Sequence, residues 1–315
     1  MTAVQKTRTL IEMTGLGRRF GKEWAVRDLN LKLDAGQILG LMGPNGAGKT
    51  TTLKMLATLE FPTCGDVRID GASALEDPAR VRPLIGFMPE RFGLYENLTV
   101  FEYLDVFGRI HGFRGESLTR ILEDVIDLTE LTGRRDVLIS SLSKGVRQRL
   151  FLAKTLIPDP PILLLDEPSS GLDPRARVDL AALLVDLKEQ GKGIIISSHI
   201  LSELESMVTH VAVMEAGVLV HSGPIQIGAL EPRRTMELAL LAGADEARIV
   251  LESRADVEIV SLTADHLLMT VHGDSRRVGD LLSDLNAAGV RFYTCRERTP
   301  SLEDVYLEVT RGLVT

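Results

Sequence analysis

The stretch Gly43-Pro44-Asn45-Gly46-Ala47-Gly48-Lys49-Thr50-Thr51 decides the fold. It follows an apolar run at residues 38–42, which predicts a buried strand, and it precedes Leu53, Leu56 and Leu59, whose spacing predicts a helix. A glycine-rich loop between a strand and a helix is the context of a phosphate-binding loop, because glycines let successive backbone N–H groups turn toward phosphate oxygens. The N-terminus of the helix adds its positive dipole end. The stretch therefore predicts a nucleoside triphosphate site, with contacts from all nine residues.

Two side chains of this loop add chemistry to the backbone cradle. Lys49 supplies a mobile cation for the β- and γ-phosphates, and the Thr50 hydroxyl can ligate Mg²⁺. The alternative interpretation is a glycine-rich turn that carries a lysine. The match of strand, loop and helix in the required order disfavours that alternative, but the loop alone does not identify the enzyme.

The composition is that of an ordinary globular protein, with 44% apolar and 25% charged residues in a chain of 315. That length favours two domains. A net charge of −8 argues against a general nucleic-acid surface, and the two cysteines cannot form a disulfide framework. No segment approaches the ~18 consecutive apolar residues of a membrane span, and the polar first residues lack the apolar core of a signal peptide. A role in a membrane process would therefore need another polypeptide in the bilayer.

The first two hundred residues change period along the chain. Residues 8–36 predict strands, with turns at three glycines: Gly15, Gly17 and Gly21. From Thr99, which predicts a capping box with Glu102, helical spacing predominates, so residues 91–156 form a predicted helical insert. Continuous apolar runs at 161–166 and 193–198 predict parallel strands buried on both faces and joined by a crossover helix.

A second pattern follows the composition shifts near Gly223-Pro224 and Glu231-Pro232. Apolar runs at 247–251, 267–271 and 290–294 predict strands, and helical spacing at 278–285 and 301–309 predicts two helices. We therefore expect a small α+β domain at residues 231–315.

Three polar side chains follow the two predicted parallel strands: Asp166 and Glu167 follow the first, and His199 follows the second. Ligands bind at this edge of open α/β sheets. Asp166 is suited to hold Mg²⁺, and Glu167 is suited to polarise an attacking water as a general base. His199 can donate a hydrogen bond to the γ-phosphate. The alternatives are two capping acids and a structural histidine, and the phosphate loop upstream disfavours both.

The order of these motifs resembles the nucleotide-binding subunit of ATP-binding cassette (ABC) transporters over about residues 8–225. The family signature is matched by Leu142-Ser143-Lys144-Gly145-Val146, which alone predicts only a serine-capped helix start. The dimer-contacting loop is matched by Ser170-Gly171-Leu172-Asp173, and the switch histidine by His199. Phe20 stands where the family places an aromatic ring against adenine, with Trp24 as a competitor. The stretch at residues 300–308 resembles the last helix of exporter-type ATPases with a short C-terminal extension, although it also fits an ordinary capped helix.

The resemblance implies a P-loop NTPase of the α/β class: a cassette at residues 1–230, with an antiparallel β subdomain and the helical insert, and an α+β accessory domain at 231–315. It implies that Glu167 and His199 are catalytic. It also implies a set of ligands for Mg²⁺. Further contacts to ATP are implied from the signature of a second subunit that faces the first. The implied Mg²⁺ ligands are Thr50, Glu90 and Asp166, and the implied signature contacts are Ser143, Lys144 and Gly145. Two positions depart from the family. Lys144 and Val146 stand where glycine and glutamine are commonest, and Glu90 stands where a glutamine usually links Mg²⁺ to the membrane partner.

The implied function is ATP hydrolysis that powers a membrane transporter, an exporter by subgroup. Two such subunits, identical or similar, would close on ATP and move a permease on a separate chain at the cytoplasmic face of the membrane, with no nucleic-acid partner. One alternative is a soluble ABC-type ATPase that regulates ribosomes or DNA, but such relatives usually carry tandem cassettes, coiled coils or basic arms. A P-loop metabolic kinase would leave the signature and His199 without a role. The cargo is not encoded in this chain.

Overall fold

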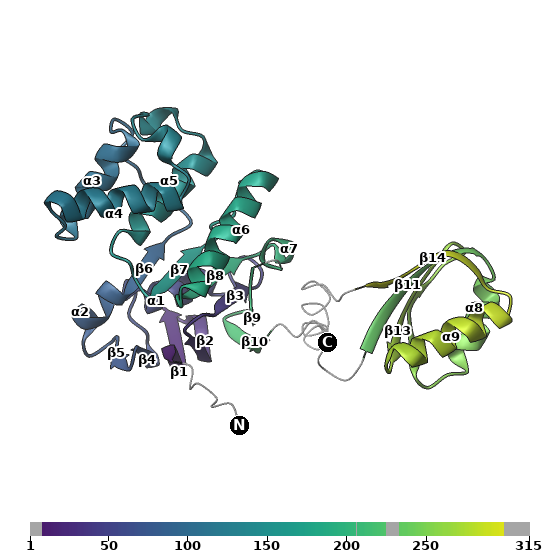
Figure 1. Cartoon of the computed structure of the whole chain (residues 1–315). Helices are drawn as coiled ribbons and strands as arrows, with labels where there is room; N and C mark the ends of the chain where they lie inside the picture. The colour runs from purple at the N-terminus through teal and green to yellow at the C-terminus, as the bar shows by residue number, and fades with distance from the viewer. Residues whose placement is uncertain (1–7, 206, 225–232, 299–315) are drawn as a thin grey trace, which may run out of the picture. The chain divides into compact units, whose positions relative to one another are not determined.

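The computed structural model describes residues 8–205, 207–224 and 233–298 and divides the chain into two compact units, Met1–Ile225 and Gln226–Thr315 (Figure 1). The sequence analysis placed this boundary between residues 230 and 231. The helix expected at 301–309 lies outside the described residues.

A six-stranded sheet in the order β10-β9-β3-β8-β7-β6 is the centre of the first unit. Its strands are β3 (Ile38–Met42), β6 (Ile85–Met88), β7 (Ile162–Asp166), β8 (Gly193–Ser198), β9 (His210–Glu215) and β10 (Val218–Pro224). All neighbours are parallel except β9 and β10, which form a hairpin. Every residue of β3, β7 and β8 is buried, as the continuous apolar runs predict for strands covered on both faces.

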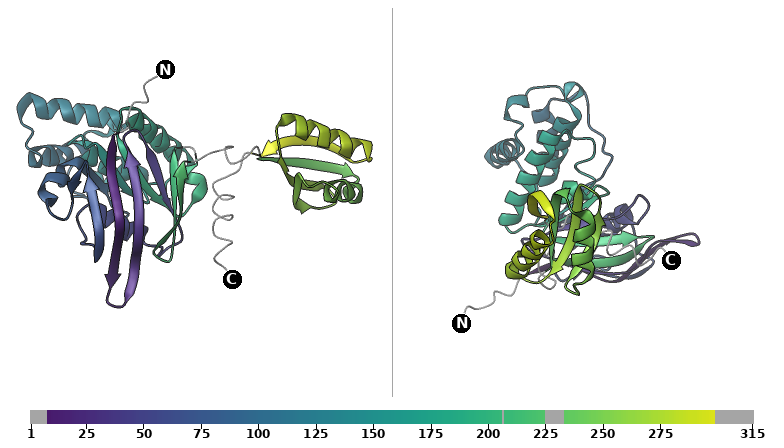
Figure 2. Two further views of the ribbon diagram at one scale, coloured as in Figure 1. Left: turned by 90° about the horizontal axis from the view of Figure 1, so that it is seen from below. Right: turned by 90° about the vertical axis from the view of Figure 1, so that its right-hand side faces the viewer.

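A second, antiparallel sheet has the order β2-β1-β4-β5. Its strands are β1 (Thr9–Phe20), β2 (Glu23–Asp34), β4 (Cys64–Ile69) and β5 (Ala72–Ser73). The long strands β1 and β2 run side by side (Figure 2). The turns expected at Gly15 and Gly17 are wrong: both glycines lie inside β1, where shifts in the pairing register absorb them, and only Gly21 lies in the hairpin turn.

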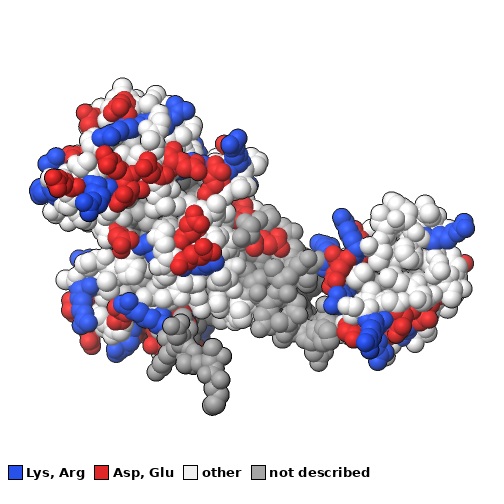
Figure 3. All heavy atoms as spheres, in the orientation of Figure 1, with Lys and Arg blue, Asp and Glu red and all other residues white. Residues whose placement is uncertain are grey.

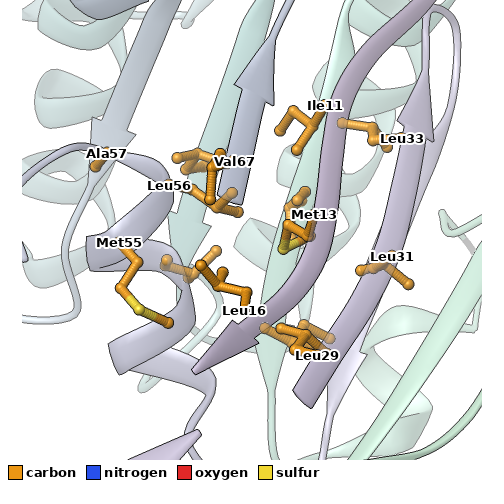
Figure 4. Close-up of a cluster of buried hydrophobic side chains, with 14 of the residues drawn as sticks. Ile11, Met13, Leu16, Leu29, Leu31, Leu33, Met55, Leu56, Ala57 and Val67 are labelled. Atoms are coloured by element: carbon orange, nitrogen blue, oxygen red, sulfur yellow. The ribbon is translucent and has the colours of Figure 1, made fainter. Parts of the chain in front are cut away.

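A hydrophobic core lies between the antiparallel sheet, one face of the six-stranded sheet and α1 (Lys49–Leu56). Side chains from β1, β2 and β4 meet Leu56 and its neighbours at the end of α1 (Figure 4). Each fully buried leucine here contributes about 1.5–3 kcal/mol. The helix ends earlier than the leucine spacing predicts, because Thr58 takes a left-handed conformation (φ +57°), and Leu59 is consequently exposed.

Three helices form the predicted insert: α3 (Val100–Ile110), α4 (Gly115–Leu128) and α5 (Lys144–Leu156). The capping box at the start of α3 is confirmed, since Thr99 accepts from the Glu102 N–H and the Glu102 carboxylate accepts from the Thr99 N–H. The remaining α-helices in the described residues of the first unit are α2 (Pro78–Val81), α6 (Pro174–Glu189) and α7 (Leu201–Leu204). The crossover helix predicted between β7 and β8 is α6.

In its described residues, 233–298, the second unit has the order β-α-β-β-α-β, which is that of ferredoxin-like domains. Its elements are β11 (Arg233–Ala242), α8 (Ala244–Glu252), β12 (Val257–Leu262), β13 (His266–His272), α9 (Ser275–Ala287) and β14 (Arg291–Arg298). The antiparallel sheet has the order β12-β13-β11-β14, and both helices share one core with it. The unit therefore has its own hydrophobic core.

One predicted strand of this unit is wrong. Residues 247–251 lie in α8, where Ala247 and Leu251 are four positions apart and buried, while Arg248 and Ile249 are exposed. Five residues are too few to separate this helical spacing from a strand by pattern alone. The strands β11 and β12 were not predicted, whereas β13, α9 and β14 match predicted elements.

Charged side chains of both signs are interspersed on the face of the first unit shown in Figure 3, with acidic groups gathered over the helical insert. This distribution agrees with the net charge of −8. None of the helices in the described residues is long and apolar enough to cross a membrane.

Candidate functional site

Four polar segments meet at one edge of the six-stranded sheet. The phosphate-loop sequence follows β3, Glu90 comes shortly after β6, Glu167 follows β7 and His199 follows β8. Because β3, β8, β7 and β6 are parallel neighbours, their carboxyl ends lie together. This is the edge at which open α/β sheets bind ligands.

Two glycines of the loop occupy places that no side chain could fill. Gly48 has φ +100°, and a Cβ there would lie 2.3 Å from the Ala25 carbonyl oxygen. Gly43 has φ +149°, and its Cβ would lie 2.2 Å from the Met214 carbonyl oxygen. The loop is thus held against the backbone of β2 and β9, so its shape depends on the packing of neighbouring strands and not on the loop alone.

Lys49, the first residue of α1, is buried at 6% exposure. Its ammonium group donates to the carbonyl oxygens of Gly43 (2.7 Å) and Pro44 (3.1 Å) and lies 3.8 Å from Glu167 Oε1. Burial lowers the pKa of Lys49 below its ordinary value, and the nearby carboxylates of Glu167, Asp166 and Glu90 act in the opposite direction. The cation is therefore fixed inside the loop and surrounded by negative charge.

Asp166 is the most buried acid of this edge, at 1% exposure. Thr50 Oγ1 donates to its Oδ2 (2.8 Å), and Ser197 Oγ donates to its Oδ1 (2.6 Å). Across the described part of the chain no basic side chain forms an ion pair with this carboxylate. A buried carboxylate with only hydroxyl partners, next to a second oxygen ligand at Thr50, fits a hard divalent cation such as Mg²⁺.

Glu167 adopts a left-handed backbone conformation (φ +50°), which costs about 1–2 kcal/mol for a residue with a side chain. The Ser197 hydroxyl accepts from the Glu167 N–H (2.9 Å) and stabilises this conformation. The side chain consequently turns toward the loop, where its two oxygens meet Lys49 on one side and His199 Nδ1 (2.9 Å) on the other. The strand end thus aims the carboxylate at the loop.

A pocket of about 410 Å³ joins these groups. The predicted residues that line it are Asn45, Gly46, Ala47, Gly48, Lys49, Thr50, Thr51, Glu90, Glu167 and His199. Gly43, Pro44 and Asp166 lie behind this lining and hold it through the contacts described above. The structure therefore brings together the phosphate loop, both predicted catalytic side chains and Glu90.

The two candidate adenine-stacking rings stand outside the pocket lining. Phe20 is 48% exposed at the end of β1, with the Arg18 guanidinium 4.6 Å above its ring centroid. Trp24 is 38% exposed, with Arg19 over its ring, and only its neighbour Ala25 lines the pocket. Both rings are available for stacking, so the prediction for Phe20 remains a prediction.

The signature residues also lie outside the lining of this pocket. Ser143 caps α5 by accepting from the Val146 N–H, as its sequence predicts. A Cβ on Gly145 would lie 3.4 Å from Leu172, and one on Gly171 would lie 2.2 Å from the Lys144 ammonium. The signature thus packs against the loop at 170–173, and a single chain does not bring it to its own phosphate loop.

Three contributors to the site were not predicted. Ser170 and Ala25 line the pocket, and Ser197 hydrogen-bonds both Asp166 and Glu167. The available signal for Ser197 was its polarity at the end of an otherwise apolar strand. Its pairing with Asp166 across β8 and β7 requires the sheet order.

Comparison with known proteins adds independent findings. The family model described as "ABC transporter" matches residues 26–170. The Nod factor export ATP-binding protein I of Burkholderia lata is 32% identical over 300 residues, which cover 95% of this chain and 96% of that protein. The bacitracin transport ATP-binding protein BcrA of Bacillus licheniformis is 32% identical over 305 residues, covering 96% of this chain and 98% of that protein.

Solved structures share the fold of the first unit. The dimeric structure of MJ0796, described as a bacterial ABC transporter cassette, matches with a TM-score of 0.63 at 25% sequence identity and covers 69% of this chain and 99% of that chain. The sequence matches extend beyond this share of the chain, so the similarity to the two relatives includes the second unit.

Proposed function

The chain belongs to the ABC transporter family and is one of its ATP-hydrolysing subunits, and on that premise we propose that it powers an exporter whose permease is a separate chain. The observation that carries the mechanistic part is the convergence of Lys49, Glu167 and His199 on one pocket. Export is supported by the similarity to an ATP-binding protein of Nod factor export, which aligns over 95% of the chain. A soluble regulator of ribosomes or DNA has no such support.

The phosphate loop is the proposed binding site for the triphosphate. The N-terminus of α1 and the backbone of Asn45 to Gly48 face the pocket, where phosphate oxygens would accept hydrogen bonds from N–H groups. Lys49 would exchange part of its contact with the Gly43 and Pro44 carbonyls for the β- and γ-phosphates. Phe20 is the proposed stacking partner of the adenine ring.

The oxygen ligands at this edge fit Mg²⁺. Thr50 and Asp166 already lie within hydrogen-bonding distance of each other, and Glu90 lines the same pocket. Mg²⁺ would supply charge neutralisation between the phosphates and these carboxylates. The three side chains are the proposed holders of the ion.

Glu167 and His199 are the proposed catalytic residues. The Glu167 carboxylate is positioned to accept a proton from an attacking water, which is the role of a general base. The Glu167 carboxylate accepts a hydrogen bond from His199 Nδ1. Nε2 is the ring nitrogen left for the γ-phosphate, to which it would donate when the ring carries both protons. The Ser197 hydroxyl accepts from the Glu167 N–H and so fixes the backbone from which both the base and its contact with His199 are positioned.

The signature residues Ser143, Lys144 and Gly145 are proposed to act on the nucleotide of a second subunit, identical or similar. Their position away from the pocket of their own chain supports this proposal, as does the dimeric state of a related cassette. Closure on ATP and reopening after hydrolysis would then be a two-state switch governed by the γ-phosphate. The helical insert is the proposed route to the permease at the cytoplasmic face of the membrane.

Purification of the tagged chain from its native membranes in mild detergent tests this proposal. We expect a hydrophobic multi-span protein to co-purify and the ATPase activity to depend on Mg²⁺. Recovery of ribosomes or DNA in place of such a protein would favour the soluble regulator.

A further inference from the structure

A buried acid just outside the pocket has no part in the mechanism above. Glu203 lies in α7, four positions after His199, and its side chain is 4% exposed. A carboxylate removed from water to this degree is costly unless a positive charge compensates it. A positive charge close to the Glu203 carboxylate is therefore expected.

The compensating charge comes from another helix. Arg177 in the second turn of α6 places its Nη1 3.0 Å from Glu203 Oε1, which joins α6 to α7 (Figure 1). The contact is an ion pair without hydrogen-bond geometry, since Glu203 Oε1 and Arg177 Nε are both buried and have no hydrogen-bond partner among the described residues. The pair is thus held by charge, and because Glu203 is buried while Arg177 is 38% exposed, removal of Arg177 leaves the Glu203 carboxylate poorly compensated.

The electrostatic environment of Glu203 includes the reacting groups. Burial raises the pKa of Glu203 above its ordinary value, and Arg177 opposes that change. Among the smaller influences on this pKa, the Glu167 charge raises it and His199 lowers it. Glu203 consequently lies within electrostatic reach of the two side chains that we propose to be catalytic.

Arg177, the other partner of the ion pair, lies in α6, which directly follows the 170–173 loop that contacts the signature. Asp173 caps α6 by accepting from the Ala176 N–H (2.9 Å), so the 170–173 loop and the first turns of α6 form one continuous piece. That loop packs against Lys144 and Gly145. The ion pair therefore connects the signature side of the chain with the strand end that carries His199.

We propose that the Arg177–Glu203 ion pair is a positioning element for the ATPase reaction, which holds the segment after β8 so that His199 stays against Glu167. The inference rests on the proposed role of His199. Arg177 and Glu203 act through that histidine and do not touch the nucleotide pocket. Because α6 carries one partner, a displacement of the 170–173 loop would also displace His199.

A role in fold stability alone is the competing explanation, and the variants are chosen to separate the two. Glu203→Gln keeps the shape and removes the charge, and Arg177→Met keeps the aliphatic stem. Arg175→Met is the matched control, because Arg175 is exposed two positions away on the same helix. The measurements are ATP affinity, kcat and the thermal unfolding temperature of the full-length chain.

We expect each single variant to lower kcat about tenfold, which corresponds to the coupling energies of contacting residues. ATP affinity should not change, because neither side chain contacts the pocket, and Arg175→Met should behave as wild type. The charge-reversed double variant Arg177→Glu/Glu203→Arg should recover part of the lost kcat. Unchanged kcat in both single variants would overturn the proposal. So would a loss of kcat that is accompanied by a lower unfolding temperature and a weaker ATP affinity, because that combination indicates a general loss of stability.

The decisive comparison uses a His199→Ala background. If the pair acts through His199, Glu203→Gln should cause no further loss of residual turnover there. A further loss of similar size would show that the pair acts elsewhere and would refute this inference alone. Wild-type turnover of His199→Ala itself would instead refute the proposed role of His199.

Discussion

The Lys49 ammonium group lies 3.8 Å from Glu167 Oε1, so the cation proposed to bind phosphate and the carboxylate proposed to activate water share one buried corner of the pocket. Coulomb energies at this distance are several-fold larger at a protein surface than in bulk water. A phosphate that approaches Lys49 therefore also approaches a negative charge. We therefore expect substitutions that change the charge of a pocket residue to have large effects on ATP affinity or turnover.

Replacing Lys49 by alanine removes the one lysine or arginine among the described residues that line the pocket. Since a charge-assisted hydrogen bond contributes about 1.5–3 kcal/mol, ATP affinity should fall by roughly tenfold or more. Isothermal titration with Mg²⁺-ATP measures this change. Lys54→Ala, an exposed lysine on the same helix, should retain wild-type affinity. Equal affinities for all three proteins would contradict the proposed phosphate loop.

Replacing Glu167 by glutamine keeps the shape of the side chain and removes the base. We expect kcat to fall by about 10²–10⁴-fold, the usual contribution of a general base. ATP should still bind and should hold the subunits together as a dimer, which light scattering detects. Glu189→Gln, at the exposed end of α6, is the control. Hydrolysis at the wild-type rate would remove Glu167 from the mechanism.

Ser197→Ala tests a residue that the sequence analysis did not identify. The change leaves Asp166 Oδ1 and the Glu167 N–H without their hydroxyl partner in a buried place, which should destabilise the fold by about 1–3 kcal/mol. The same change frees the left-handed backbone of Glu167, so kcat should fall as well. Chemical denaturation and turnover assays measure the two effects. A destabilised protein with full turnover would show that Ser197 serves stability only.

The site was predictable to the extent that its residues are consecutive or directly follow strands. The loop from Gly43 to Thr51 and the strand ends at Asp166 and His199 are local signals, and the parallel sheet brings them together as expected. Ser197 could not be assigned in this way, because its role depends on which strand lies beside β7. The Arg177–Glu203 pair likewise joins two helices whose packing no local pattern specifies.

The errors in the fold have similar causes. Leu59 continues the helical spacing of α1, but the left-handed Thr58 ends the helix before it. In α8 a five-residue apolar segment fits either a strand or a helix, and only the packing of Ala247 and Leu251 against the neighbouring sheet selects the helix. Hydrophobic periodicity indicates neither a left-handed residue nor the packing of a helix against a sheet.

Deletion of residues from 232 onward should leave nucleotide binding intact. The residues that line the pocket all belong to the first unit, and each unit has a separate hydrophobic core. We therefore expect the truncated chain to unfold cooperatively and to bind ATP with the affinity of the full chain. Loss of binding in a truncated protein that remains folded would show that the second unit contributes to the site.

Glu90 lies in the pocket at a position where the family resemblance leads us to expect a glutamine. It lines the pocket together with Lys49, and its charge acts on the pKa of that lysine. A glutamine would offer Mg²⁺ a neutral oxygen, whereas a carboxylate offers a charged one, which is the stronger ligand for a hard cation. In the absence of metal, the same carboxylate would repel the γ-phosphate.

Glu90→Gln should therefore narrow the difference in ATP affinity between Mg²⁺ and chelator conditions. Affinity with chelator should rise several-fold, because a negative charge facing the phosphates is gone, and affinity with Mg²⁺ should fall or stay level. ATP titrations of both proteins with and without Mg²⁺ measure the change. Glu96→Gln is the matched control, because Glu96 is an exposed acid that pairs with Arg147 (2.8 Å) and does not line the pocket. If Glu90→Gln keeps the metal dependence of the wild type, Glu90 is not a metal ligand, and its place at the edge of the pocket then points to contact with the permease.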